Sequence, residues 1–175
     1  MVIDTSAVVA ILFGEPEGAA YATAIEQATT RLVSAVTRVE LACVIEGRKG
    51  EAGHAMIERF LELADIEVSA VTPQQAMAAI EGFRNFGKGR DRAALSIGDC
   101  FSYALAKSAS QPLLFKGRDF AQTDIEPAIR PERNSYSAVS TKSVKASPAS
   151  QPNPSSSGES ADHIAAVRRL PLSGA

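Results

Sequence analysis

The stretch that decides the fold is short: Met1-Val2-Ile3-Asp4-Thr5-Ser6. Its second and third residues are apolar and predict a short buried strand that ends at Asp4. The next two residues, Thr5 and Ser6, are of types that cap helices, here a helix over residues 7–13. Because a strand turns directly into a helix at this point, we expect Asp4 at the carboxyl edge of a sheet. That edge is where open α/β sheets bind ligands.

Short strands and helices alternate along the following hundred residues. Strands are predicted at 31–35, 66–71 and 112–115, and helices at 19–28, 37–50, 51–64, 73–86 and from Ser96 onward. The helix at residue 73 has the clearest start signal, since Thr72 precedes Pro73 and Gln75 completes a capping box. This alternation predicts an α/β fold with three layers, in which a mainly parallel central sheet is flanked by helices.

The overall composition is that of an ordinary globular protein, with 45% hydrophobic residues, 22% charged residues and a net charge of −2. The chain is therefore no polycation, and nucleic-acid binding would need a local basic patch, metal ions or a partner's charge. Cys43 and Cys100 lie in apolar helical segments and are expected to pack in the core of a cytoplasmic protein. Neither a signal peptide nor a membrane-spanning segment is expected.

The composition changes near residue 131. Residues 131–175 hold five of the nine prolines, eleven serines and no Phe. Such a segment cannot bury enough apolar surface to offset its ordering entropy, so it is predicted to be a disordered tail. We therefore expect one folded domain, residues 1–130, and a Ser/Pro-rich tail that is either a functional linker or a non-native read-through.

Four acidic residues stand at predicted strand-to-helix junctions: Asp4, Glu40, Asp99 and Asp119. Glu40 follows Thr37 by three residues and Asp99 follows Ser96 by three residues, which is the spacing of a capping box. A cap stabilises a helix by roughly 1 kcal/mol and needs no catalytic role. For Glu40 and Asp99, a role as helix cap is therefore as good an interpretation as a chemical role. The same holds for Asp119, which is predicted to lie in a turn.

Taken together, the four acids predict a metal site. Residues that follow parallel strands gather at one edge of the sheet, and four carboxylates there would raise each other's pKa unless a cation were present. Oxygen ligands favour Mg²⁺, with Mn²⁺ as a second possibility. Such a site suits phosphodiester hydrolysis, because a metal activates water and stabilises charge on phosphate oxygens.

Several basic residues are candidates for contacts to RNA phosphates: Lys88, Arg90, Arg92, Lys116 and Arg118. The nearby Phe83 and Phe86 are expected to pack in the core instead of stacking on bases. His54 lies on a polar helix surface and His163 in the tail, and neither has a spaced partner, so neither is expected to act as a general base.

Four segments of this chain resemble the PIN-domain ribonucleases, and most of all the VapC toxins of bacterial toxin–antitoxin pairs: residues 1–7 (MVIDTSA), 34–40 (SAVTRVE), 95–107 (LSIGDCFSYALAK) and 112–120 (PLLFKGRDF). The resemblance covers nearly all of residues 1–128. It implies a PIN-like fold, Mg²⁺-dependent RNA cleavage, a cognate VapB-type antitoxin and a homodimer. By position it also implies metal-site roles for Asp4, Glu40, Asp99 and Asp119.

The chain departs from the family pattern in two places. Arg118 stands where many relatives carry a second acid, so Asp119 is taken as the fourth site residue, with Asp124 as the alternative. The tail, residues 131–175, has no counterpart in the family pattern.

These observations support three functional hypotheses. The first is a Mg²⁺-dependent endoribonuclease toxin acting on a tRNA or an rRNA loop, since proteins reach single-stranded loops more easily than paired A-form helices. The second is a non-catalytic module that binds RNA or an antitoxin and uses the acids only as helix caps. The third is a structure-specific DNA nuclease. Metal-dependent turnover separates the first two, and competition between RNA and DNA separates the third.

Overall fold

The computed structural model describes residues 1–130, which form a four-stranded sheet with six α-helices. The strands are β1 (Val2–Ile3), β2 (Leu32–Ser34), β3 (Glu67–Ser69) and β4 (Leu113–Leu114). The helices are α1 (Thr5–Leu12), α2 (Gly18–Gln27), α3 (Ala35–Lys49), α4 (Glu51–Leu63), α5 (Pro73–Phe86) and α6 (Ile97–Ala109), with a single 3₁₀ turn η1 (Phe120–Gln122). The predictions made for the tail and for His163 lie outside the described residues.

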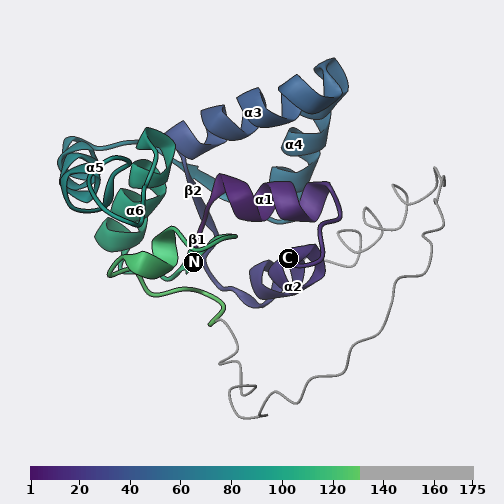
Figure 1. Cartoon of the computed structure of the whole chain (residues 1–175). Coiled ribbons are helices and arrows are strands. Elements are labelled where there is room, and N and C mark those ends of the chain that lie inside the picture. The colour runs from purple at the N-terminus through teal and green to yellow at the C-terminus, as the bar shows by residue number, and fades with distance from the viewer. Residues whose placement is uncertain (131–175) are drawn as a thin grey trace, which may run out of the picture.

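All four strands are parallel, in the order β3-β2-β1-β4. Val2 of the central strand β1 pairs with Leu32 on one side and with Leu113 on the other. Because the strands run in one direction, their carboxyl ends lie along a single edge of the sheet, and the first residue beyond β1 at that edge is Asp4. Figure 1 shows the strands at the centre of the molecule with helices around them.

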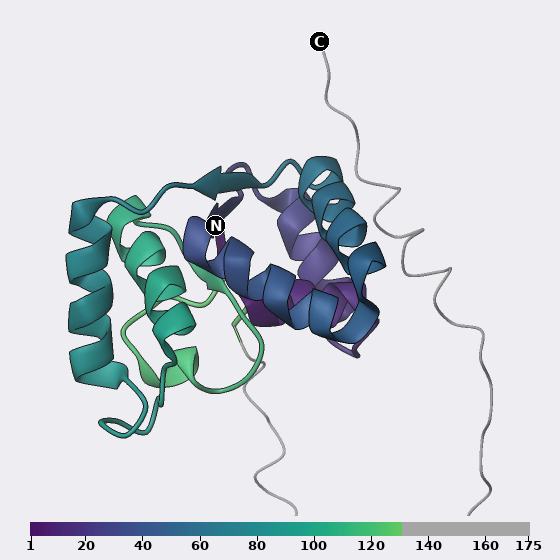
Figure 2. The same cartoon turned by 90° about the horizontal axis from the view of Figure 1, so that it is seen from above.

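Two hydrophobic cores lie on opposite faces of the sheet. Side chains of a strand point alternately to its two faces. Ile3 and Leu114 accordingly join the core formed with α1, α2, α3 and α4, whereas Val2 and Leu113 join the core formed with α5 and α6. Figures 1 and 2 show α5 and α6 together on one side, away from α2 and α4, with the start of α3 against α6. The predicted three-layer α/β fold is confirmed.

Two helix starts differ from the prediction. Asp4 itself caps α1, because its carboxylate accepts a hydrogen bond from the Ser6 backbone N–H at 2.9 Å, so the assignment of Thr5 and Ser6 as caps was wrong. Helix α3 begins at Ala35 after the cap Ser34, so Thr37 is not a cap. Each helix begins within two residues of the end of the preceding strand. The capping box predicted at Thr72 and Gln75 is confirmed.

The two cysteines have different surroundings. Cys100 is buried as expected, and its burial raises the pKa of the thiol to about 11. Cys43 is exposed, so its assignment to the core was wrong. Helix α3 buries a narrow stripe at Thr37, Leu41 and Ile45, and Cys43 lies off that stripe. Both thiols are free. None of the helices within residues 1–130 is long and apolar enough to cross a membrane.

Candidate metal centre

Asp4 is the most buried acid of the site, with a side chain that is 2% exposed. Its Oδ2 accepts hydrogen bonds from the Ser6 backbone N–H (2.9 Å) and from Ser6 Oγ (2.7 Å), and its Oδ1 accepts one from Ser102 Oγ (2.8 Å). Burial raises the pKa of Asp4, the bonds from Ser6 oppose the rise, and the charge of Asp99 adds to it. Asp4 is therefore held rigidly in a place where its negative charge is costly.

Glu40 approaches Asp4 from α3. Its half-buried side chain accepts a hydrogen bond from Thr5 Oγ1 to Oε2 at 2.8 Å. Burial is the main cause of its raised pKa, and the charges of Asp4 and Asp99 raise it further. Since α3 begins at Ala35, Glu40 lies in the second turn of the helix and cannot complete a capping box there. The capping interpretation of Glu40 was wrong.

Asp99 forms the capping box that its spacing predicted. Ser96 Oγ accepts a hydrogen bond from the Asp99 backbone N–H (3.1 Å), and Asp99 Oδ2 accepts one from the Ser96 backbone N–H (2.7 Å). This capping box opens α6. The Asp99 charge also acts on both Asp4 and Glu40. The structure therefore brings Asp4, Glu40 and Asp99 together, from β1, α3 and α6.

The two candidates for a fourth acid lie apart from these three. Asp119 is exposed, precedes η1 without capping it, and does not contribute to the pKa shifts of Asp4 or Glu40. Asp124 accepts a hydrogen bond from the Tyr103 hydroxyl (2.9 Å) and forms an ion pair with Lys107 Nζ (2.9 Å). The structure thus joins neither residue to the cluster, and a metal-site role for Asp119 stays a prediction.

The chemistry of the three acids fits a hard divalent cation. Within residues 1–130 no three acidic, thiol or imidazole side chains already form a metal-binding group. Asp99 bonds to the Ser96 backbone, and Asp4 accepts hydrogen bonds from two hydroxyl groups. All three side chains are nevertheless carboxylates, the ligands that Mg²⁺ and Mn²⁺ prefer. The charge of Asp99 raises the pKa of Asp4, the charges of Asp4 and Asp99 raise the pKa of Glu40, and a cation would remove that repulsion.

Two buried hydroxyl groups, those of Ser102 and Thr37, support the site; Ser102 was not among the predicted site residues, and Thr37 was expected only as a helix cap. Ser102 Oγ donates to Asp4 and lies 3.0 Å from Thr37 Oγ1, and both residues are 0% exposed. The signal in the sequence was a polar residue within the apolar stripe of a helix: Thr37 shares its stripe with Leu41 and Ile45, and Ser102 lies among the buried residues of α6. Such a residue needs a partner: here Thr37 bonds to Ser102, and Ser102 bonds to Asp4.

We expect Ser102→Ala to destabilise the domain by about 1–3 kcal/mol, because Asp4 and Thr37 each lose a buried hydrogen-bond partner. Urea unfolding measures the effect. Ser108→Ala on the same helix is the matched control: Ser108 is exposed, its hydroxyl donates to the Leu105 carbonyl and accepts from Gln75 Nε2, and its loss at the surface should cost less than about 0.5 kcal/mol. Equal losses in both variants would contradict a supporting role for Ser102.

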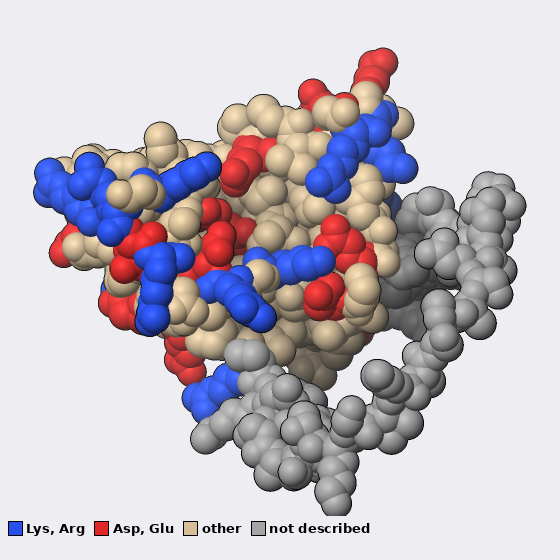
Figure 3. Space-filling view, viewed as in Figure 1, with Lys and Arg blue, Asp and Glu red and all other residues tan. Residues whose placement is uncertain are grey.

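No ion pair among the described residues joins a basic candidate to Asp4, Glu40 or Asp99. Figure 3 shows acidic side chains over the middle of the face seen in Figure 1, with Lys and Arg side chains among them and on both sides. Lys116 forms ion pairs with Glu15 (2.6 Å) and Glu17 (3.3 Å). Arg90 stacks over the Phe83 ring at 5.2 Å. Their role in RNA binding stays a prediction.

The two aromatic residues expected in the core, Phe83 and Phe86, are half-buried and pack against the core beneath α5 and α6. Phe86 also lies against the ring of Tyr103, with the ring centroids 5.7 Å apart. His54 lies on the surface between Glu46 and Glu58, away from the three acids.

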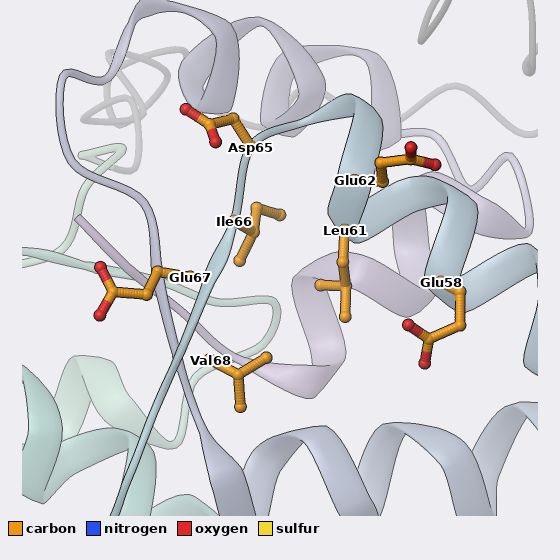
Figure 4. A pocket seen from close by; sticks show the side chains of 7 residues that line it. All are labelled: Glu58, Leu61, Glu62, Asp65, Ile66, Glu67 and Val68. Atoms are coloured by element: carbon orange, nitrogen blue, oxygen red, sulfur yellow. The ribbon is translucent and has the colours of Figure 1, made fainter.

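A shallow pocket of about 410 Å³ lies elsewhere, between α4 and β3 (Figure 4). It includes Glu67, at the amino end of β3, and so lies at the opposite edge of the parallel sheet from Asp4. Three of its acids are already paired with arginines: Glu58 with Arg38, Glu62 with Arg59 and Asp65 with Arg31. The pocket contains none of the predicted site residues.

Comparison with known proteins identifies the class. The PIN domain family matches residues 1–126. VapC ribonuclease Mb0640 of Mycobacterium bovis and Ribonuclease VapC30 of Mycobacterium tuberculosis are each 49% identical over 131 residues, which is 75% of this chain and 100% of the relative. Ribonuclease VapC of Mycolicibacterium smegmatis is 49% identical over 125 residues, 71% of this chain and 97% of the relative.

In this chain, the parallel sheet and the acid at the carboxyl end of its central strand thus lie within the residues that match the PIN domain. The chain belongs to the PIN-domain family, and within that family to the VapC ribonucleases, which are metal-dependent enzymes.

Proposed function

We propose that this protein is a Mg²⁺-dependent endoribonuclease toxin that hydrolyses RNA phosphodiester bonds. The observation that supports this most is the convergence of Asp4, Glu40 and Asp99, three carboxylates from separate elements whose charges act on one another. An arrangement that only capped helices would not need Glu40, which caps none. The similarity to proteins named VapC ribonuclease supports the same conclusion.

Each of the three acids would bind the cation from a position that the fold fixes. Ser6 and Ser102 orient Asp4, Thr5 orients Glu40, and the capping box anchors Asp99 at the start of α6. When bound, Mg²⁺ supplies activation of the attacking water and stabilisation of the charge that develops on the phosphate oxygens. Asp119 is proposed as a fourth acid that reaches the site from the segment after β4.

The partners follow from the same assignment. We propose a cognate VapB-type antitoxin that neutralises the enzyme, a tRNA or an rRNA loop as substrate, and a homodimer. Helix α5 leaves Met77 and Ile80 exposed at 63% and 46%, which supports its use as a contact surface between two copies of the chain.

The test is cleavage of total cellular RNA by purified, antitoxin-free protein. We expect discrete fragments with Mg²⁺, none with EDTA, and full recovery when excess Mg²⁺ or Mn²⁺ is added back, since the bound metal would activate the attacking water. A matched DNA pool should stay intact. Fragments that persist in EDTA would contradict a metal-dependent reaction.

One observation favours the alternative of a non-catalytic binding module: Asp99 is fully explained as a helix cap. That alternative predicts retention of RNA on the folded, metal-loaded protein without any new RNA ends. Cleavage with Mg²⁺ would exclude it.

A further inference from the structure

Gly98, in the first turn of α6, lies directly against the carboxylate of Glu40. A Cβ placed on Gly98 would be 2.6 Å from Glu40 Oε1 and 2.7 Å from both Cδ and Oε2. Contacts this short do not occur for real side chains. Any residue other than glycine at position 98 therefore forces the Glu40 carboxylate to move.

The backbone at position 98 does not itself require glycine. Gly98 has an ordinary helical conformation, in contrast to Gly14, Gly50, Gly89 and Gly117, which have positive φ angles. Helix propensity would favour alanine at such a position. The need for glycine therefore comes from the neighbouring carboxylate.

Other glycines of the domain make contacts of a different kind. A Cβ on Gly82 would meet the ring of Tyr103, one on Gly53 would meet Ile45, and one on Gly18 would meet the backbone of Ala10. These contacts serve the packing of helices against one another. Gly98 differs from these three, because its missing side chain leaves room for a charged group.

The opposite side of Glu40 is held by α1, where Thr5 Oγ1 donates to Oε2 at 2.8 Å. The Glu40 carboxylate is thus confined between the Thr5 hydroxyl on α1 and Gly98 in the first turn of α6, and Gly98 directly precedes Asp99. We propose that Gly98 is a positioning residue: its missing side chain lets Glu40 lie beside Asp99, and this sets the affinity of the site for a divalent cation. This role of Gly98 rests on the proposed function, and it adds to the metal site a residue that has no side-chain atom to bind the cation.

The experiment compares Gly98→Ala with Gly47→Ala in the full chain. Gly47 lies on α3, the helix of Glu40, and a Cβ there would meet nothing within 4 Å, so it reports the effect of helix propensity alone. Mn²⁺ affinity is measured by electron paramagnetic resonance, RNA cleavage by kcat and KM, and folding by urea. For Gly98→Ala we expect Mn²⁺ affinity and kcat to fall about 10-fold to 100-fold. KM should be unchanged, and the urea midpoint should be unchanged or higher. Gly47→Ala should match the wild type in affinity and kcat.

A second pair of variants separates displacement of the Glu40 carboxylate from a general disruption of the fold. Glu40→Asp shortens the side chain and withdraws its carboxylate from Gly98, so Glu40→Asp alone should weaken Mn²⁺ binding. Adding Gly98→Ala to Glu40→Asp should cause no further loss, because the clash is already gone, and the two effects should be far less than additive. Should Gly98→Ala fail to fold, the double variant must fold, and its failure would overturn the inference.

The outcomes also distinguish the inference from the function on which it rests. If the wild type binds Mn²⁺ and cuts RNA, and Gly98→Ala does both equally well, the role of Gly98 is overturned and the proposed function stands. Additive losses in the double variant would do the same. A wild-type protein that neither binds Mn²⁺ nor cuts RNA would overturn both.

Discussion

Asp99→Asn should lower the rate of RNA cleavage by about 10³-fold and leave the stability of the domain almost unchanged. Asparagine has the shape of aspartate and keeps an oxygen that can accept the bond from the Ser96 backbone N–H, so the capping box survives. What is lost is the negative charge beside Asp4 and Glu40, and with it a ligand of the proposed cation. Fragment formation from total RNA and urea unfolding measure the two effects.

Ser96→Ala is the matched control, because it damages the cap and spares the charge. Ser96 Oγ accepts the Asp99 backbone N–H at 3.1 Å, and its removal should cost about 1 kcal/mol of stability. Cleavage at saturating Mg²⁺ should stay within a few-fold of the wild type. If Asp99→Asn instead cleaves RNA at the wild-type rate, Asp99 is a helix cap and nothing more.

Asp4→Asn should also abolish cleavage, but in metal-free protein it should raise stability at neutral and alkaline pH. Burial raises the pKa of Asp4, so the folded state binds this proton more tightly than the unfolded state does. The resulting stabilisation is present below the unfolded pKa, whose usual value is 3.8, and is lost as the pH rises through the folded pKa. Asparagine carries no charge to desolvate and still caps α1 through the Ser6 backbone N–H.

The measurement is the free energy of unfolding in urea with EDTA, at intervals from pH 5 to pH 8. The advantage of Asp4→Asn over the wild type should grow as the pH rises, since Asp4 ionises in that direction. Adding Mg²⁺ at about 100 times its Kd should stabilise the wild type by about 2.7 kcal/mol and leave Asp4→Asn largely unaffected. A wild-type protein that is more stable than Asp4→Asn in EDTA at pH 8 would show that the buried charge is well compensated without a metal.

Much of the framework was determined by local signals in the sequence. Val2 and Ile3, one residue apart, point to opposite cores because strand side chains alternate, and that alternation was expected from a buried strand between two layers of helices. The capping boxes at Thr72 and Ser96 were predicted from spacing alone, since both partners lie within one helical turn. The position of Asp4 at the end of the central strand was equally local.

The tertiary structure decided what those acids do. Glu40 and Asp99 have the same spacing from a hydroxyl residue, yet only Asp99 forms a capping box, because α3 begins earlier than its sequence suggested. The Ser102 bond to Asp4 spans 98 residues and the Thr5 bond to Glu40 spans 35, and no local pattern encodes either.

The space beside Gly98 exists only because α3 and α6 pack against each other in one register. A sequence specifies which residues lie on the buried stripe of a helix through its periodicity. The atoms that meet across two stripes depend on the close packing of the whole domain, which brings the acids together only when the fold is complete.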